Sequence, residues 1–430
     1  MLIIAAQTIA LLTSFLIFAS TLSPLNVVLI YSIFRPLLQP FAIMQYKLAG
    51  LPISTSITLA IIFVGTTCIV FRKNWRFIPD KGLLLSIVIL LAFISAVFSS
   101  DYRESATGIA KLLTIWFIFN MAYNSVNTME DARKLLFALV IGAMIPLAMG
   151  FYQAITGNYQ MLHSQTGAVD RINGVFGIGN AYGIYLSSIT AASAILLIDS
   201  VGRRKKILMA GLLGAVLTSQ VLALNRGTWI ALIIGFIVAA VKYRRFIKLH
   251  WIALGALIMA LFFVDIIAER FDDLGNRDNY YQRNTFEGRI EHWKEILALI
   301  ENKPIIGYGV GTSEVVTTKL LGQSMAPHND YILIALEMGL IAALLYFLFL
   351  LRIAAYFVFR PIVPELWIYN FSLIMLSIYF IIISSTQNIM FNVINFPLFL
   401  TMVAIGIKLD KLYAMQMLNP PHDSHSQKKS

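Results

Sequence analysis

Thirteen runs of mostly apolar residues divide this chain, and most of them approach the length that a helix needs to cross a lipid bilayer, about twenty residues. A backbone inside lipid must satisfy its hydrogen bonds internally, and runs of this length do so as helices. Hydrophobic residues make up 58% of the sequence and charged residues 13%, outside the range of soluble globular domains. We therefore predict an all-α fold, a polytopic transmembrane helical bundle of about 12 spans, over residues 1–411. The runs cover 2–21, 24–37, 54–71, 83–100, 106–124, 135–154, 180–198, 207–224, 228–242, 250–267, 331–351, 366–386 and 390–407.

The first two runs leave the side of the N-terminus open. No basic segment precedes run 2–21, so we interpret it as a retained span and not a cleaved signal. Run 24–37 contains Arg35-Pro36 and is followed by Pro40, which favours a short or re-entrant piece. The single cysteine, Cys68, lies in an apolar run and is interpreted as a small core residue.

Lysine and arginine mark alternate connections between the runs, which is the usual signature of cytoplasmic loops. The net charge of +11 is then explained by basic residues on the cytoplasmic loops, where they contact anionic membrane lipids. It gives no support to a nucleic-acid partner. We expect a multi-pass membrane protein whose tail, residues 412–430, is cytoplasmic and disordered. The basic positions are Arg72, Lys73, Arg76, Lys81, Arg203, Arg204, Lys205, Lys206, Lys242, Arg244, Arg245, Lys248, Arg352, Arg360, Lys428 and Lys429.

The long polar stretch 268–330 falls on the opposite side and is predicted to be a large periplasmic loop. Asn284 and Glu287 form a capping-box pattern, and apolar residues then recur at helical spacing until Pro304. This predicts an amphipathic helix with Arg289 in its first turn; the apolar positions are Ile290, Trp293, Ile296, Leu297 and Ile300. Arg289 then either faces a ligand, or it snorkels or pairs with Glu287 or Glu291.

Two short patterns follow this helix. Glycines at 307, 309 and 311 resemble a phosphate-binding loop, but no strand precedes them, so a flexible turn is the better interpretation. Pro327-His328-Asn329-Asp330 then leads into run 331–351, which places His328 at a helix N-terminus. The positive end of the helix dipole favours a neutral imidazole there, so His328 is a candidate general base, unless His328 or Asn329 merely caps the helix.

Charged residues within and beside the outward ends of the runs complete the candidate site. Glu337 lies seven residues after Asp330, so the two share a helix face, and an ionisable group at membrane depth is a functional candidate. Arg171 and Arg226 precede outward helix starts and otherwise serve as interfacial anchors. Three arginines with a neutral histidine, and no cluster of metal-ligand spacing, suggest phosphate recognition without a metal or other cofactor.

The ordered motifs resemble the O-antigen ligase and polymerase superfamily of bacterial envelope glycosyltransferases. They are Arg226-Gly-Thr-Trp, Gly288-Arg289-x-x-x-Trp293, Pro304-x-x-Gly-x-Gly309-x-Gly, Pro327-His328-Asn329-x-Tyr331 and Glu337-x-Gly339-Leu340, with the upstream segment 171–180. The resemblance covers roughly residues 165–350, and it identifies that region as the catalytic one.

The resemblance implies an enzyme that moves a glycan from a polyprenyl diphosphate carrier to an acceptor hydroxyl, with inversion at the anomeric carbon. Arg226 and Arg289 would hold the diphosphate as leaving group, and His328 would orient or deprotonate the acceptor. The implied partners are the carrier-linked donor, an acceptor that is a carrier-linked repeat or lipid A core, membrane lipids and a chain-length regulator. The remaining residues assigned to substrate binding are Arg171, Asn180, Trp293, Asn329, Asp330 and Glu337.

Several functions remain open at this stage. We favour a repeat-unit polymerase, because the polar loop is compact and holds no separate acceptor domain. A ligase to lipid A core or to protein is the alternative within the superfamily. An anion or solute transporter is the alternative of another class, although Lys111 and Glu337 stand nearly alone as charges inside the runs. A structural scaffold would leave the outward arginines unexplained.

Overall fold

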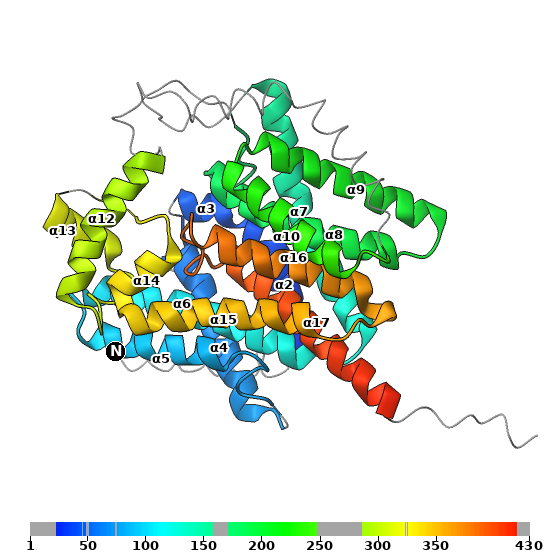
Figure 1. The fold of residues 1–430 in the computed structure, drawn as a ribbon, viewed down its shortest axis with the longest axis horizontal. Helices are drawn as coiled ribbons and strands as arrows, with labels where there is room; N and C mark the ends of the chain where they lie inside the picture. Colours follow the sequence, from blue (N-terminus) through cyan, green and yellow to red (C-terminus); the bar gives the residue numbers. More distant parts are fainter. Residues whose placement is uncertain are drawn as a thin grey trace, which may run out of the picture.

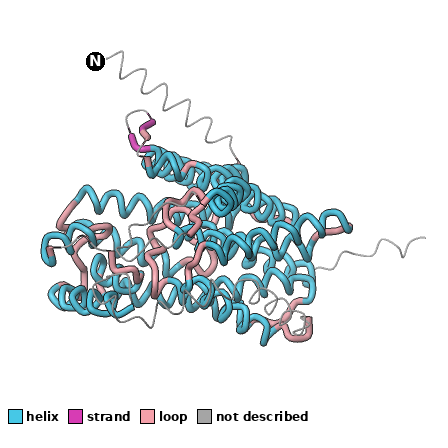
Figure 2. Tube along the Cα trace, turned by 90° about the horizontal axis from the view of Figure 1, so that it is seen from above, coloured by secondary structure: helices cyan, strands magenta, loops and turns pink. Residues whose placement is uncertain are grey.

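The computed structural model describes residues 23–418 apart from 45, 49–50, 74, 158–170, 247–285, 323 and 325, and these residues form a helical bundle (Figure 1). The predicted all-α class is confirmed; within the described residues, strand is confined to a hairpin of β1 (Lys47–Leu48) and β2 (Leu51–Pro52), which Figure 2 shows at the edge of the bundle. The helices are α2 (Pro24–Leu37), α3 (Gln39–Ile43), α4 (Ile53–Phe71), α5 (Leu83–Val97), α6 (Tyr102–Ser125), α7 (Met129–Thr156), α8 (Gly179–Asp199), α9 (Arg203–Leu222), α10 (Arg226–Lys242), α12 (Phe286–Asn302), α13 (Ser313–Leu321), α14 (Asp330–Met338), α15 (Leu340–Phe359), η2 (Pro364–Leu366), α16 (Trp367–Ile383) and α17 (Asn395–Leu418).

Seven of the described helical segments are long and apolar enough to cross a membrane. They are α4, α6, α7, α8, α9, α15 and the continuous stretch Pro364–Ile383, while α2 and α5 are apolar but shorter. Runs 2–21 and 250–267 lie outside the described residues, so the count of about 12 spans stays a prediction. The short α2 ends at Leu37 just after Pro36, in line with the expected interruption of run 24–37.

Local sequence sets where the helices begin and end. Helix α7 begins with a reciprocal capping box in which Thr128 and Asp131 bond to each other's backbone amides, and it ends at Gly157, whose φ is 65°. Helix α6 begins where the Asp101 carboxylate accepts from the amides of Arg103 and Glu104. Such caps place helix ends at two levels, and these levels become the two faces of the bundle.

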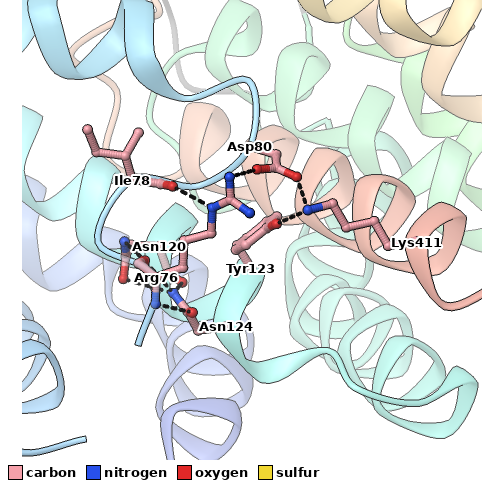
Figure 3. A network of polar contacts seen from close by, with 7 residues as sticks. All are labelled: Arg76, Ile78, Asp80, Asn120, Tyr123, Asn124 and Lys411. Carbon is pink, nitrogen blue, oxygen red and sulfur yellow. Dashed lines mark hydrogen bonds and ion pairs between the residues drawn. The ribbon is translucent and has the colours of Figure 1, made fainter. Parts of the chain in front are cut away.

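One end of the bundle gathers the basic residues that the sequence predicted to be cytoplasmic. Arg133 at the start of α7 makes two hydrogen bonds, of 2.6 and 3.1 Å, to Asp199 at the end of α8. Arg360 after α15 pairs with Asp410 of α17. Figure 3 shows a third cluster, in which Asp80 pairs with Arg76 and with Lys411, whose ammonium also donates to Tyr123 at 3.0 Å. We call this face the basic end.

Helices α12 and α13 lie at the opposite end of the bundle from the last turns of α17 (Figure 1). Helix α12 covers Phe286–Asn302, so the helix predicted after Asn284 is confirmed, while Asn284 itself lies outside the described residues. Its buried positions are His292, Ile296 and Ile300, with Ile290 and Trp293 partly buried, but Leu297 is exposed. The amphipathic pattern is therefore correct in period, and Leu297 falls outside the buried face.

Run 331–351 is two helices, so its prediction as one span is wrong. Helix α14 ends at Met338, and Gly339 adopts a φ of 89° before α15 begins. The last carbonyl groups of α14 are taken by a neighbouring loop: Leu336 O accepts from Tyr308 N and Glu337 O accepts from Gly309 N, at 3.0 and 2.9 Å. These bonds satisfy the helix end without a continued helix, which hydropathy alone does not reveal.

The tail prediction also needs correction. Helix α17 continues to Leu418, so residues 412–418 are helical and not disordered. Leu412 and Tyr413 are apolar and pack against the hydrophobic core, which extends the helix beyond the run that ended at 407. Residues 419–430 lie outside the described part of the chain.

We predict that Gly339→Ala destabilises the bundle by more than about 2 kcal/mol, because a Cβ there would collide with the Ile305 carbonyl at a φ that L-residues rarely adopt. Thermal unfolding of the detergent-solubilised protein measures this. The matched control is Gly211→Ala on α9, where an added Cβ meets nothing within 4 Å, and it should leave Tm unchanged or slightly higher. Equal Tm values for the two variants would contradict the close approach at Gly339.

Candidate functional site

The candidate site is built around the connection between α16 and α17, residues 384–394, which we call the α16–α17 linker. It lies at the end of the bundle opposite the basic end, because α16 begins beside the basic end and finishes here. Distant parts of the chain bond to it, among them the start of α8, helix α12, and the start of α14 with the residue before it. Side chains far apart in sequence are therefore brought to one place.

Asp330 fixes the conformation of this linker. Its carboxylate is fully buried and accepts from the amides of Ile389 and Met390, at 2.9 and 3.1 Å, and from the Tyr346 hydroxyl at 3.1 Å. Its own amide donates to Ser384 O at 2.7 Å. Hydrogen bonds to a charged group typically contribute about 1.5–3 kcal/mol each, so Asp330 ties the first turn of α14 firmly to the linker.

Arg289 reaches the same linker from α12. Its Nη1 donates to Thr386 O at 3.2 Å, while its Nε is buried and has no hydrogen-bond partner in the structure. Burial lowers the pKa of the guanidinium, which remains far above neutrality. Within the described residues, no carboxylate pairs with Arg289, and Glu291 is exposed. The cation is thus held by a neutral carbonyl, with donor capacity left over.

His328 lies near enough to Arg289 for the guanidinium charge to act on its imidazole, and it is held as the neutral base. Its pKa is lowered to about 4, mainly by burial and in addition by the nearby Arg289 and His292. The loop that carries it is fixed to α12, because the Trp293 indole donates to Pro327 O at 2.7 Å. The φ of His328 is 49°, a left-handed conformation that is uncommon outside glycine and typical of functional positions.

Asn329, not His328, caps α14. Its Oδ1 accepts from the amides of Tyr331 and Ile332, at 2.9 and 3.2 Å. Its own amide donates to Asn388 Oδ1 of the linker at 2.9 Å. Of the two residues that could cap the helix, Asn329 is the cap of α14. The imidazole of His328 does not have that role.

Asn180 bonds to the linker, Arg171 bonds to Asn180, and Arg226 precedes a residue that lies beside the linker. Arg171 donates to Asn180 Oδ1 at 3.3 Å, and Asn180 donates to Gln387 at 3.5 Å. Arg226 is the first residue of α10, whose cap Asn225 accepts from Thr228 N at 3.3 Å. The next residue, Gly227, packs against Thr386, the residue whose carbonyl binds Arg289. The starts of α8 and α10 therefore meet α12 across this one linker.

Glu337 belongs to a different contact. Its buried carboxylate accepts from Gly311 N at 2.7 Å and from Ser313 N at 3.1 Å, and its carbonyl accepts from Ser95 at 2.6 Å. It therefore holds the glycine-containing turn 307–311 against α14 and α5. Asp330 and Glu337 lie on one short helix, but they bind different segments, and the structure does not bring Glu337 to His328.

Four residues of this site were not among the candidates drawn from the sequence. Thr386, Gln387 and Asn388 form part of a polar stretch, Ser384 to Asn388, whose first three residues fall at the end of run 366–386 and whose last two lie between that run and run 390–407. His292 is buried at one helical turn from Arg289 and on the same face of α12. Two sequence signals point to these residues. One is a run of five consecutive polar residues between two spans, and the other is a histidine three positions after an arginine.

Comparison with known proteins finds a family whose model matches part of the candidate site. Residues 212–347 match the model of the family described as O-antigen ligase. A protein of Rickettsia conorii (strain ATCC VR-613 / Malish 7) that bears the name "Putative polysaccharide ligase" is 23% identical over 296 residues, which cover 64% of this chain and 67% of that protein. The resemblance to the O-antigen ligase and polymerase superfamily is thereby confirmed: residues 212–347 of this membrane protein are similar to the O-antigen ligase family. The family match includes Arg226, Arg289 and residues 328–330 and stops before the α16–α17 linker.

We predict that Asp330→Ala frees the linker and lowers the free energy of unfolding by several kcal/mol, because the buried amides of Ile389 and Met390 lose their acceptor. Hydrogen exchange read by mass spectrometry should be faster in a peptide covering 384–394. Tyr346→Phe is the control: it removes one donor to Asp330 but keeps both amide bonds, so it should cost about 1 kcal/mol and leave exchange nearly unchanged. Unchanged exchange in Asp330→Ala would show that the linker is held by something else.

Proposed function

We propose that this protein is a membrane glycosyltransferase that moves a glycan from a polyprenyl diphosphate carrier to a sugar hydroxyl on the outer face of the bacterial inner membrane. The observation that carries the proposal is that Arg289, bound to the α16–α17 linker, lies near a neutral His328 at the end of the bundle away from the basic end. The family match over residues 212–347 supports the same class of chemistry.

The donor would bind through its diphosphate. As the bond between the anomeric carbon and the phosphate oxygen breaks, its electron pair stays on that oxygen and negative charge grows on the leaving group. A guanidinium fixed at this point stabilises the transition state more than the bound substrate. Arg289 keeps donor capacity in a buried setting, and Arg226 and Arg171 approach from α10 and α8, so the proposal assigns all three to the diphosphate.

His328 would take the proton of the attacking hydroxyl. An imidazole whose pKa is about 4 is neutral at physiological pH but is a weak base. A bound diphosphate places negative charge beside it, which raises the pKa towards neutrality and strengthens the base when the donor is present. The proton then resides on the imidazole while the oxygen joins the anomeric carbon from the side opposite the leaving group, which inverts the configuration.

The remaining residues would position these groups. We assign Asp330 and Asn329 to the geometry of the linker and the His328 loop, Trp293 to the placement of α12 against that loop, and Asn180 to the orientation of Arg171. Glu337 would act at a distance by holding the 307–311 turn. The catalytic region then includes the linker and extends beyond the 165–350 range that sequence motifs suggested.

Two acceptors fit this donor site. A carrier-linked repeat makes the enzyme a polymerase of O-antigen or exopolysaccharide, which the compact polar loop favours. A lipid A core makes it a ligase, and this second candidate is favoured by the names of both the matching family and the Rickettsia protein. A chain-length regulator would be a partner of the polymerase alone.

We predict that the purified protein transfers glycan from a polyprenyl diphosphate donor, and that the acceptor decides between the candidates. Donor alone should yield a ladder of chain lengths if the protein is a polymerase, whereas product that forms only with added lipid A core identifies a ligase. Arg226→Ala and Arg289→Ala should each reduce turnover by about 10²-fold or more. Gly211→Ala serves as the matched control with full activity. Full activity of both arginine variants would defeat the proposed donor site.

We also predict the pH dependence of kcat/KM, which reports ionisations of the free enzyme. Because the folded pKa of His328 is lowered to about 4, the base form persists as pH falls, and activity should decline only near pH 4. An ordinary imidazole would instead give a decline near pH ~6.5. The ratio of wild type to His328→Gln removes the donor's own titration, and the variant should be slower by about 10²–10⁴-fold. A decline in that ratio near pH 6.5 would contradict a buried neutral His328.

A further inference from the structure

His292 is a buried imidazole, 5% exposed, and neither Nδ1 nor Nε2 has a hydrogen-bond partner among the residues that the structure describes. Buried polar atoms are nearly always hydrogen-bonded, because leaving one unpaired costs about 1–3 kcal/mol. An ordinary core histidine would be satisfied by a neighbouring carbonyl or hydroxyl, so the position calls for another explanation.

The surroundings of His292 indicate what it faces. It lies three residues after Arg289 on α12, so the two side chains project from the same face, and its charge influences His328. The Arg289 Nε is likewise buried without a partner. The nearest carboxylate, that of Glu295, lies 3.6 Å from Nδ1 and is half exposed. Two adjacent residues of one helix face therefore present unused hydrogen-bonding nitrogens beside the candidate base.

We propose that His292 binds the diphosphate of the donor together with Arg289, as a positioning residue of the same site; this inference rests on the proposed function. A phosphate oxygen between the two side chains would accept from Arg289 Nε and from one ring nitrogen of His292. In the tautomer that carries its proton on Nε2, that nitrogen would donate to the phosphate oxygen. Among the titratable groups near His292, the Glu295 carboxylate lies 3.6 Å from Nδ1, and His328 is close enough to be influenced by His292.

The proposal predicts that replacing His292 affects ligand affinity and protein stability differently. If His292 serves a ligand, the unpaired nitrogens are a cost to the empty protein, so an apolar replacement of similar volume should not lower Tm. If His292 is a structural core residue, the same replacement should lower Tm and leave affinity unchanged. Ile300, buried on the same face of α12 two turns further on, provides a matched structural control.

The experiment uses the full chain in nanodiscs, with farnesyl diphosphate as a short polyprenyl diphosphate probe and with Kd and Tm measured for each variant. His292→Leu should weaken binding about tenfold or more while the Tm of the ligand-free protein stays equal or rises. His292→Gln, which restores a donor, should recover binding to within about threefold of wild type. Ile300→Ala should lower Tm with little change in Kd.

The outcomes distinguish this inference from the proposed function. If Arg289→Ala weakens binding but His292→Leu does not, the inference is overturned while the donor site stands. A His292→Leu variant that loses Tm as Ile300→Ala does, and that Gln does not rescue, would also overturn it and mark His292 as structural. If wild type does not bind the probe at all, the proposed donor fails first and the inference with it.

Discussion

The buried carboxylate of Asp330 is the contact on which the rest of the candidate site depends. It joins the first turn of α14 to the α16–α17 linker by accepting from the amides of Ile389 and Met390, and it also accepts from the Tyr346 hydroxyl of α15. The backbone amide of Asp330 adds a bond to Ser384 O. His328 lies two residues before Asp330, and Thr386 lies two residues after Ser384, so this one junction sets the spacing between the imidazole and the carbonyl that holds Arg289. A buried carboxylate requires such complete hydrogen bonding, and that requirement makes the junction rigid.

Basic side chains have different partners at the two ends of the bundle. At the basic end, Arg133, Arg360 and Lys411 each pair with an aspartate, and these pairs join α7 to α8, α15 to α17, and α17 to the connection before α5. At the other end, Arg289 binds a neutral carbonyl. An arginine neutralised by a carboxylate supports the fold, whereas one held by a carbonyl keeps its positive potential for an anion. The same residue type thus serves structure at one face and, as we propose, recognition at the other.

Hydropathy and caps were enough to predict most of the architecture. The positions of α4, α6, α7, α8, α9 and α10 follow the apolar runs to within a few residues, and Arg289, His328 and Asn329 were correctly placed near helix starts. Hydropathy averages over about a turn or more, so it missed the break at Gly339 inside run 331–351 and the polar residues 384–386 at the end of run 366–386. The convergence of Arg289 on Thr386, 97 residues apart, depends on tertiary contacts that no local pattern encodes. Asp330 illustrates the limit, because its residue type suggested a ligand contact and its surroundings show a structural junction.

Several departures from ordinary backbone geometry and hydrogen bonding lie at this same end. His328 adopts a left-handed backbone conformation, and unpaired nitrogens occur at Arg289 and His292 on adjacent turns of α12. Each departure destabilises the empty protein, and a fold retains such departures where a bound ligand offsets them. Because Trp293 fixes α12 against the His328 loop and Asp330 fixes that loop against the linker, the site cannot relax to satisfy these groups on its own. The rigidity that keeps them unsatisfied is therefore the same rigidity that preorganises them for an anion.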